Sequence, residues 1–413
     1  MSKLDDLINK LCPNGVEYKT LGEVVEFRAG WGFPETEQGL TEGKYPFYKV
    51  GDMNNSEMFM DTANNYISED TSKKLKCKPA PKGTIIFPKI GATMNTNKKR
   101  ILTKESCYDN NVMGIIAKSI NDRFLYYFFS QYRLIDFAKG TGAVPSLDTN
   151  RLKSLQIPVP PLPVQEEIVR ILDTFTSLTA ELTAELTARR KQYEYYRDSL
   201  LTRETKVEVK KLGEVCLQTE NVKWKTEKGE YQYIDLTSVD RETHSITETV
   251  KIDSSNAPSR AQQIVKENDV LFGTTRPMLK RTAFITKEFD NQICSTGYCV
   301  LRANSELVNP RYIYHQISTS SFYKYVDSHQ QGASYPAISD SDVKKFPIPL
   351  PPLDVQQRIV NVLDNFDAIC TDLKIGLPAE IEARKKQYEY YRDMLLSFDT
   401  IHTNGGGRAE AMR

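Results

Sequence analysis

The sequence predicts a mixed α/β protein in which two compact modules are joined by two long helices related by an internal pseudo-two-fold. Residues 157–175 (IPVPPLPVQEEIVRILDTF) recur as residues 348–366 (IPLPPLDVQQRIVNVLDNF), with 12 of the 19 positions identical. Residues 191–201 (KQYEYYRDSLL) recur as residues 386–396 (KQYEYYRDMLL) with one difference. Such a repeat indicates one structural unit used twice. The intervening segments match only faintly, so two different modules are expected on one repeated frame.

The size and composition are those of an ordinary globular protein. A chain of 413 residues with 39% hydrophobic and 26% charged residues is expected to form two or three domains. No run approaches about 18 consecutive apolar residues, and residues 1–11 are amphipathic with acidic residues at positions 5 and 6, unlike a signal sequence. The seven cysteines are scattered and form no CxxC pair, which favours a reducing compartment. We therefore expect a cytoplasmic protein that does not bind a membrane.

The charge distribution is uneven although the net charge is only +1. Such a balance argues against indiscriminate coating of nucleic acid but leaves room for local basic surfaces. Residues 80–118 carry seven Lys or Arg against two Asp or Glu, and residues 258–302 carry seven against four. Because the two windows occupy corresponding places in the two halves, each module is expected to have a basic face.

Both modules are predicted to mix strands and helices. Short apolar runs between turn formers are typical of strands, which we expect at residues 84–87, 112–117, 270–272 and 298–301. Helices are predicted at residues 122–132 and 310–318. Pro145 and Pro336 occupy equivalent places ahead of the repeated proline-rich segments.

Each proline-rich segment is followed by a long predicted helix. Apolar residues recur at helical spacing from Val164 and again from Val355, and proline suits the first turn of a helix. Each helix is expected to be roughly 40 residues long, which is about 60 Å at about 1.5 Å per residue. A long helix with one apolar stripe must pack that stripe against a partner helix, and the other copy of the repeat is the candidate partner.

The two predicted helices differ in their middle. The first contains residues 179–186, TAELTAEL, which form a tandem four-residue repeat. The second has Gly376 and Pro378 at the corresponding place. Because both residues disfavour a helix interior, this second helix is predicted to kink or to break briefly.

No convincing catalytic signature occurs in the sequence. It contains no G-x-x-x-x-G-K-[ST] phosphate loop, no G-x-G-x-x-G, no HExxH, no G-x-S-x-G and no Asn/Asp-Pro-Pro-aromatic tetrapeptide of the amino-methyltransferases. With four histidines in all, a histidine-rich metal site is not expected. The sequence therefore predicts no catalytic residue, no bound metal and no cofactor.

Polar, cationic loops are the candidates for binding DNA. Arginine can donate two hydrogen bonds to guanine, Asn and Gln match adenine, and lysine neutralises phosphate. For any single residue a solvated surface loop is the alternative interpretation, whereas the pairing of loops between the halves favours DNA contact for the group. The predicted DNA-binding residues are Lys89, Asn95, Asn97, Lys98, Lys99 and Arg100 on the first basic loop, Lys139 on a loop continuing through residues 140–142, Thr274, Thr275, Arg276, Lys280 and Arg281 on the second basic loop, and His329, Gln330 and Gln331.

The repeated KQYEYYRD segments are candidates for contacts with partner proteins. Tyr193 and Tyr196 can face a helix partner, which leaves Tyr195 and Arg197 on another side. Packing within the chain is the alternative, but outward residues that are unchanged in both copies suggest that both faces are used. The predicted partner-binding residues are Gln192, Tyr195, Arg197, Gln387, Tyr390 and Arg392.

The order of modules and repeats resembles the specificity subunit of type I restriction–modification systems. The resemblance rests on IPxPPLxxQ, on a long helix closing with YYRDxLL and on the TAEL units, and it covers nearly the whole chain. It implies two DNA target-recognition domains, residues 1–158 and 204–349. These would be joined by two antiparallel, coiled-coil spacer helices, residues 159–203 and 350–398. Residues 399–413 are expected to be a disordered tail.

The resemblance also implies how such a chain works. Each recognition domain would bind one half of a split, asymmetric sequence in double-stranded DNA, with the helices fixing the spacer between the halves. Two methyltransferase subunits carrying S-adenosylmethionine would methylate adenine, and translocase–endonuclease subunits using ATP and magnesium would complete the restriction complex. The chain itself would be non-catalytic. Two alternatives stay open: a stand-alone nuclease or methyltransferase with unrecognised motifs, and a coiled-coil protein scaffold.

Overall fold

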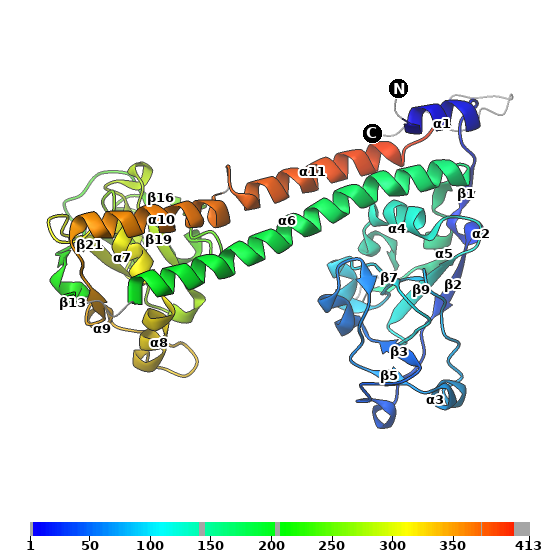
Figure 1. Cartoon of the computed structure of the whole chain (residues 1–413), viewed down its shortest axis with the longest axis horizontal. Helices are drawn as coiled ribbons and strands as arrows, with labels where there is room; N and C mark the ends of the chain where they lie inside the picture. The colour runs from blue at the N-terminus through cyan, green and yellow to red at the C-terminus, as the bar shows by residue number, and fades with distance from the viewer. Residues whose placement is uncertain (1–2, 140–144, 203–206, 373, 400–413) are drawn as a thin grey trace. The chain divides into compact units, whose positions relative to one another are not determined.

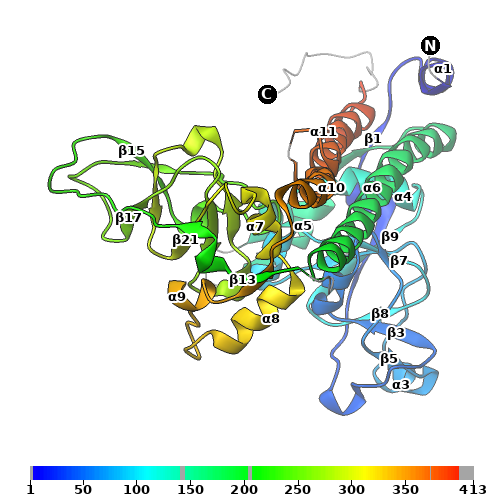
Figure 2. The same ribbon diagram turned by 60° about the vertical axis from the view of Figure 1, so that its left-hand side comes forward.

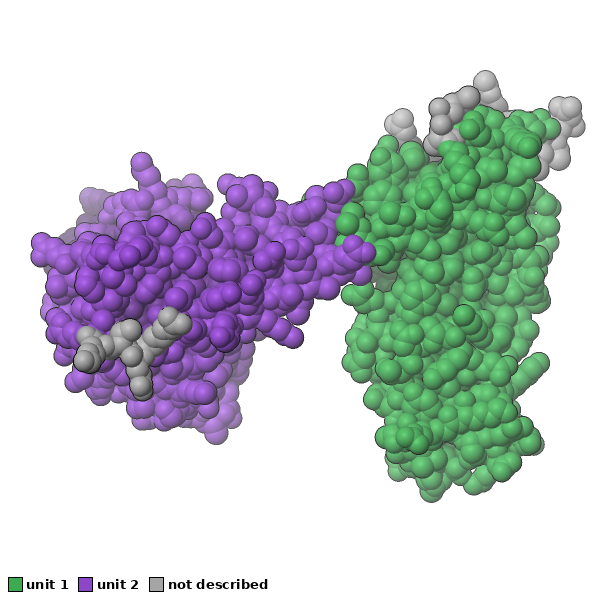
Figure 3. Space-filling view, in the orientation of Figure 1, with its two compact units in different colours: residues 1–178, 385–413 green, residues 179–384 purple. Residues whose placement is uncertain are grey.

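The computed structural model (Figure 1, Figure 2) describes residues 3–139, 145–202, 207–372 and 374–399. The chain divides into two compact units, coloured separately in Figure 3. Unit 1 comprises residues 1–178 and 385–413, and unit 2 comprises residues 179–384. From residue 400 onward the predicted tail lies outside the described residues. Among the helices of the described part, none is long and apolar enough to span a membrane.

Two sheets form the body of the first module in unit 1 (Figure 1). Their strands are β2 (Val25–Ala29), β3 (Tyr45–Tyr48), β4 (Phe59–Met60), β5 (Tyr66–Ile67), β6 (Ile85–Pro88), β7 (Arg100–Leu102), β8 (Cys107–Tyr108) and β9 (Val112–Ala117). The sheets have the orders β2-β9-β6-β7-β4 and β5-β3-β8. Strands β6 and β9 confirm the predictions at 84–87 and 112–117. They pair antiparallel, with Ile85 opposite Ile115, and apolar residues fill both of their faces because both faces are buried.

The helices of the first module are short, and one of them covers the larger sheet. They are α1 (Lys3–Leu11), α2 (Leu21–Val24), α3 (Glu69–Lys74), α4 (Asp122–Ser130) and α5 (Thr149–Lys153). Helix α4 begins where the Asn121 side chain accepts hydrogen bonds from the backbone N–H groups of the first turn. Its buried Phe129 packs edge-on against Phe87 of β6, with ring centroids 5.0 Å apart. The helix predicted at 122–132 is therefore confirmed, ending two residues earlier.

Unit 2 repeats this plan with two four-stranded sheets. Its strands are β14 (Cys216–Leu217), β15 (Tyr231–Ile234), β16 (Val250–Ile252), β17 (Ala261–Ile264), β18 (Val270–Gly273), β19 (Thr282–Phe284), β20 (Ile293–Ser295) and β21 (Tyr298–Ala303). The orders are β14-β21-β18-β19 and β16-β15-β20-β17. Strands β18 and β21 confirm the predictions at 270–272 and 298–301 and pair antiparallel, with Leu271 opposite Val300.

Three helices accompany the sheets of unit 2: α7 (Pro310–Gln316), α8 (Ser320–His329) and α9 (Asp340–Val343). Helix α7 confirms the prediction at 310–318, and the Asn309 side chain caps it as Asn121 caps α4. Phe272 of β18 packs edge-on against Phe322 of α8, with ring centroids 5.0 Å apart. Both modules therefore bury a phenylalanine of a central strand against an aromatic helix.

The repeated proline-rich segments form equivalent two-stranded ladders. In unit 1, β1 (Tyr18–Thr20) pairs antiparallel with β12 (Gln156–Pro158), and Lys19 lies opposite Ile157. In unit 2, β13 (Val209–Lys211) pairs with β22 (Pro347–Pro349), and Lys210 lies opposite Ile348. Both isoleucines are fully buried. Proline lacks a backbone donor and is tolerated in such short edge pairs, which explains how the repeat forms a strand here.

The first long helix is confirmed, whereas the predicted length of the second is wrong. Helix α6 (Leu162–Thr202) is a single helix of 41 residues. The second copy is divided into α10 (Leu353–Thr371) and α11 (Leu377–Leu395), each of 19 residues. A side chain at Gly376 would lie only 2.6 Å from the carbonyl oxygen of Ala368, so the chain passes closely here. Gly376 and Pro378 thus interrupt the helix, as their positions predicted.

In unit 1, the start of α6 packs against α4 and the end of α11 (Figure 1, Figure 2). The Asp173 carboxylate accepts hydrogen bonds from the Arg123 guanidinium at 2.5 Å and from the Tyr127 hydroxyl at 2.6 Å. Phe175 stacks on Tyr391, with ring centroids 5.2 Å apart and planes 22° from parallel. The start of α6 therefore contacts both α4 of the module and α11 of the second long copy.

Unit 2 contains the same kind of junction. Here the second copy of the repeat supplies the start of the long helix, and the first copy supplies the end that packs against it. The Asp364 carboxylate of α10 pairs with Arg311 at 2.6 Å and with Nε2 of His315 at 2.7 Å, both on α7. Phe366 stacks on Tyr196 of α6, with ring centroids 5.5 Å apart. Burial opposes ionisation of Asp364, but the hydrogen bonds from His315 and Arg311 hold its pKa below the ordinary value.

A glutamine of each repeat completes the attachment of the module helix. The side-chain oxygen of Gln165 accepts a hydrogen bond of 2.8 Å from the backbone N–H of Asn121, the cap of α4. Gln356 accepts the equivalent bond, also 2.8 Å, from Asn309. The start of each long helix is thus bonded to the first turn of the helix that covers its module.

Two residues of the first basic loop are not exposed as predicted. Lys99 is 3% exposed, and its Nζ donates hydrogen bonds to the Tyr132 carbonyl at 2.7 Å and to Oδ1 of Asn97 at 2.9 Å. Arg100 begins β7, and its guanidinium donates to three backbone carbonyls, including that of Ser56 at 2.7 Å. Both residues were predicted to contact DNA, but Lys99 is bonded to the segment that follows α4, and Arg100 is bonded to Met53 and Ser56. These are tertiary contacts that local composition does not show.

We predict that replacing Asp364 with alanine lowers the free energy of unfolding by about 2 kcal/mol, because half-buried Arg311 would be left with one weaker partner. Asp367, 3.2 Å from Arg311, is that remaining partner. Urea unfolding followed by circular dichroism measures the change. The control is Glu230→Ala, which removes an exposed pair with Lys251 and should cost less than about 0.5 kcal/mol. Equal losses in both variants would contradict the assigned role.

We predict that Lys99 makes stability rise between about pH 7 and pH 9. Burial lowers the pKa of Lys99 to about 7, whereas the unfolded chain keeps its proton up to about 10.5. Over this window the unfolded state binds the extra proton, so the wild type gains up to about 1.4 kcal/mol per pH unit over Lys99→Met. Below pH 7 the difference should be constant. Unfolding curves of the two proteins that stay parallel from pH 6 to pH 9 would contradict the prediction.

Candidate nucleic-acid interface

The second basic loop connects the antiparallel strands β18 and β19 of unit 2. Residues 274–281 form this connection. Thr274 is buried, and its hydroxyl donates a hydrogen bond of 2.9 Å to the Gly297 carbonyl, so it supports the loop and does not face solvent. Thr275 is half-buried and forms an isolated antiparallel bridge with Ala337. The predicted role of Thr274 in contacting DNA is therefore at odds with its position.

Arg276 is the exposed residue at the turn of this loop. Its backbone lies in the left-handed region, with φ of 50° and ψ of 58°, and its N–H donates a hydrogen bond of 2.7 Å to the Pro336 carbonyl. The guanidinium carbon lies 4.3 Å from the ring centroid of Tyr335, which is 70% exposed. A cation and an aromatic face are thus presented together to solvent.

The structure brings the other predicted polar segment of unit 2 beside this loop. Gln331 and Ala337 exchange two backbone hydrogen bonds of 2.8 Å, which close a turn that carries Tyr335. Gln331 is exposed. His329 stacks on Tyr325 at the end of α8, with ring centroids 3.9 Å apart. The Gln330 side chain donates to the Asp327 carboxylate at 2.7 Å. His329 and Gln330 therefore have partners within the chain.

The first basic loop connects β6 and β7 of unit 1 and contains a 3₁₀ turn, Gly91–Thr96. The Gly91 N–H donates a hydrogen bond of 2.7 Å to the Pro145 carbonyl. The Leu147 N–H donates one of 2.9 Å to the Lys89 carbonyl. The backbone of the loop is thus bonded to the segment that precedes the proline-rich repeat.

Unit 2 has the same pair of backbone hydrogen bonds. Besides the bond from Arg276 to Pro336, the Ile338 N–H donates to the Thr274 carbonyl at 3.0 Å. The predicted equivalence of Pro145 and Pro336 is therefore confirmed: each accepts a bond from the basic loop of its own unit. We call this pair of bonds the backbone clip.

The remaining predicted residues of unit 1 differ in exposure. Asn95 is exposed, whereas Lys98 is half-buried and its ammonium donates to the side chain of Asn54. Burial lowers the pKa of half-buried Lys89, with the charge of Asp109 opposing that shift.

Asn97 has hydrogen-bond partners within the chain, whereas Lys139 is exposed. The Asn97 side-chain oxygen accepts from the backbone of Leu134 at 2.9 Å as well as from Lys99. Lys139 is exposed at the end of β10 (Ala138–Lys139), which pairs with β11 (Ser146–Leu147). The rest of its loop, residues 140–142, lies outside the described residues.

The repeated KQYEYYRD segments show a different pattern from the one predicted. Tyr195 and Tyr390 are 69% and 65% exposed, as expected for outward residues. Arg197, by contrast, is only 8% exposed and its guanidinium lies 5.3 Å from the Tyr193 ring centroid. Arg392 is packed in the same way over its own helix's tyrosine. The prediction that these arginines face outward is wrong, because each helix is contacted on two sides.

The two glutamines that precede these tyrosines were also predicted to contact partners. Gln192 is exposed, with its side-chain oxygen near the Arg189 guanidinium. Gln387 is half-buried. Fewer of the predicted partner-binding residues are therefore exposed than expected, and the exposed ones include Tyr195 and Tyr390.

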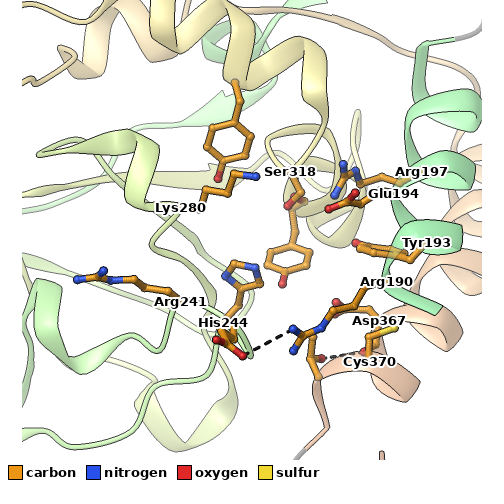
Figure 4. A pocket seen from close by; sticks show the side chains of 14 residues that line it. Arg190, Tyr193, Glu194, Arg197, Arg241, His244, Lys280, Ser318, Asp367 and Cys370 are labelled. Carbon is orange, nitrogen blue, oxygen red and sulfur yellow. Dashed lines mark hydrogen bonds and ion pairs between the residues drawn. The ribbon is translucent and has the colours of Figure 1, made fainter. Parts of the chain in front are cut away.

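A cavity of about 280 Å³ lies in unit 2 between α6, α10 and the loops of the second module (Figure 4). Lys280, predicted as a DNA contact, lines this cavity, and its Nζ lies 5.0 Å from the ring centroid of Tyr323. His244 lines it as well, and its buried Nδ1 has no hydrogen-bond partner among the residues that the structure describes. Arg281 is half-buried beside it in the chain. Lys280 therefore places one part of the second basic loop at the cavity beside α6 and α10, whereas Arg276 of the same loop faces solvent.

Tyr335 was not among the residues predicted from the sequence. It lies in the segment GASYP, residues 332–336, where Gly, Ser and Pro favour a turn. Within the described part of the chain, no group of three or more His, Cys, Asp or Glu is placed to hold a metal ion.

Comparison with known proteins places these modules in a family. Residues 13–189 and 204–383 each match the "Type I restriction modification DNA specificity domain". The type I restriction enzyme EcoR124I/EcoR124II specificity subunit of Escherichia coli is 35% identical over 318 residues, 72% of this chain and 74% of that protein. A putative type I restriction enzyme specificity subunit of Haemophilus influenzae is 32% identical over 70% of this chain and 76% of its own.

A solved structure agrees at the level of the fold. The crystal structure of the type I restriction–modification system S subunit from M. genitalium aligns with a TM-score of 0.50, over 92% of this chain and 95% of that one, at 14% identity. At that identity the likeness concerns the fold alone. The two family matches, together with the relatives above 30% identity, show that the chain belongs to the family of type I restriction–modification specificity subunits.

Proposed function

We propose that this chain selects the DNA sequence on which a type I restriction–modification complex acts. In this proposal, residues 1–158 and 204–349 are target-recognition domains, and each binds one half of a bipartite, asymmetric site in double-stranded DNA. The observation that carries the proposal is the backbone clip, which holds a basic hairpin loop in the same way in both units. Two equivalent supports for two different loops suit a protein that recognises two different half-sites.

The charges of the two loops support DNA as the ligand. Exposed or half-buried cations on them include Lys89 and Lys98 in unit 1 and Arg276 and Arg281 in unit 2. Arginine, asparagine and glutamine can recognise base edges in the major groove, whereas lysine mainly contacts phosphate. A net charge of +1 keeps non-specific attraction low, so specific contacts carry more of the binding.

The long helices are proposed to act as the spacer between the half-sites. Residues 159–203 and 350–398 would form an antiparallel, coiled-coil pair, and α6, with 41 residues, is about 60 Å long at about 1.5 Å per residue. The aromatic stacks of Phe175 on Tyr391 and of Phe366 on Tyr196 support this arrangement, since each joins the start of one copy to the end of the other. A stiff connection of this kind would fix the number of unrecognised base pairs.

Partner subunits are proposed to supply the chemistry. Tyr195 and Tyr390 are exposed in identical sequence contexts, which suits two copies of one partner. We infer that two methyltransferase subunits with S-adenosylmethionine dock there and methylate adenine. Translocase–endonuclease subunits using ATP and magnesium would complete the complex in the cytoplasm. The specificity subunit would act without a catalytic residue or cofactor of its own.

The proposal predicts that the double variant Asn95→Ala, Lys98→Gln weakens binding to duplex DNA and flattens its salt dependence. Loss of one phosphate contact should reduce the slope of log K against log salt by about 0.9. Fluorescence anisotropy tests this. The duplex contains the sequence that the complex methylates, and binding is measured at several salt concentrations. Lys10→Gln on α1 is the control, because that exposed lysine lies outside the loops. Identical slopes for the variant and the wild type would exclude these residues from the interface.

The spacer proposal predicts that one further TAEL unit after Leu186 lengthens the recognised site. Four residues add about 6 Å to a helix, and Leu182 and Leu186 show that a four-residue step keeps the half-buried face in register. At about 3.4 Å per base pair the spacer should grow by one to two base pairs. Methylome sequencing of cells carrying the variant reports the spacing. Thr183→Ala keeps the length and should keep the spacing, whereas an unchanged spacer after the insertion would refute the proposal.

A further inference from the structure

We propose that Arg276 and Tyr335 together form a guanine-binding element of unit 2, in which Arg276 donates to the base and Tyr335 positions it. The inference rests on the proposed function and names one base and one residue pair for it. Tyr335 belongs to a turn near α8, and Arg276 belongs to the β18–β19 loop. The two residues come from segments that the backbone clip brings together.

The first argument is the free donor edge of Arg276. Its guanidinium carbon lies 4.3 Å from the centroid of the Tyr335 ring, so the tyrosine covers one face of the planar group. Among the described residues, no carboxylate forms an ion pair with Arg276, and the residue is exposed. The N–H donors at the edge of the guanidinium are therefore available to a ligand, while the stacking restricts the plane in which they lie.

The second argument is the backbone at Arg276. A left-handed conformation is uncommon for a residue with a side chain, and the following Pro277 restricts the backbone further. The hydrogen bond from the Arg276 N–H to the Pro336 carbonyl holds this conformation, and Lys280 at the end of the same turn is also left-handed, with φ of 55°. Strained, over-determined backbone of this kind is concentrated at binding sites, where it fixes a side chain before the ligand arrives.

The third argument concerns the choice of base. A guanidinium has donors and no acceptor, so it needs two acceptors side by side. In the major groove guanine offers O6 and N7, whereas adenine offers one acceptor beside the N6 donor. A guanidinium held in one plane therefore matches guanine and not adenine. A phosphate could also accept two hydrogen bonds from Arg276, and the experiment below separates that contact from a guanine contact.

The test combines a protein change with an atom change in the DNA. The full chain, in the complex in which it is purified, is titrated with duplexes in which single guanines of its site are replaced by 7-deazaguanine. This base lacks the N7 acceptor and keeps its pairing with cytosine. For the wild type, replacement of one guanine should weaken binding about 10-fold. For Arg276→Gln, the same replacement should have no further effect, because the partner of N7 is already absent.

Matched variants separate recognition from general charge and from folding. Arg260→Gln removes another exposed arginine of unit 2 and should leave the 7-deazaguanine effect at about 10-fold. Tyr335→Phe retains the stacking face and should also keep the effect, whereas Tyr335→Ala should reduce it. Both tyrosine variants should unfold at the wild-type temperature, since the ring is largely exposed.

The outcomes distinguish this inference from the function on which it rests. If the wild type binds no duplex, both the proposed function and the inference are overturned. If it binds duplex DNA but no 7-deazaguanine effect depends on Arg276, only the inference is overturned. If Arg276→Gln weakens every duplex equally, Arg276 contacts phosphate and the guanine assignment is wrong. A guanine effect that disappears in Arg276→Gln and persists in Arg260→Gln supports it.

Discussion

The arrangement of each unit depends on the pairing between an aspartate of the long helix and an arginine of the module. Asp173 binds Arg123 in unit 1, and Asp364 binds Arg311 in unit 2. Both aspartates come from the repeated sequence, and both arginines lie in the first turn of a helix that covers a sheet. Because an unpaired charge is costly when removed from water, this pairing fixes the rotation of the long helix against its module.

The junction tolerates change at one position while keeping its geometry. The third member is a tyrosine hydroxyl in unit 1, from Tyr127, and an imidazole in unit 2, from His315. Burial lowers the pKa of His315, so the ring is neutral near pH 7 and can donate to Asp364 as the tyrosine does to Asp173. A neutral donor in both units leaves one arginine as the main counter-charge. The repeats thus set a common attachment for modules that otherwise differ.

The sequence predicted the features that depend on periodicity or identity. The repeats, the central strands β6, β9, β18 and β21, the capped helices α4 and α7 and the interruption near Gly376 all follow from local pattern. The burial of Lys99 and Arg197 could not be predicted in this way. Each lies on an element that is contacted from a second side by a segment distant in sequence. For the same reason, the stack of Arg276 on Tyr335 requires two segments about sixty residues apart to meet.

The backbone clip explains how one support can serve two unlike loops. Its hydrogen bonds involve only main-chain groups: Gly91 donates to Pro145 in unit 1, and Arg276 donates to Pro336 in unit 2. A glycine and an arginine therefore occupy the same structural position, although both have a positive φ, 71° at Gly91 and 50° at Arg276, which glycine adopts more readily. The main-chain bond itself does not involve the side chain, so the loop keeps its attachment in both units although the two residues differ. A recognition surface built on such bonds can change its ligand contacts while the frame beneath it stays the same.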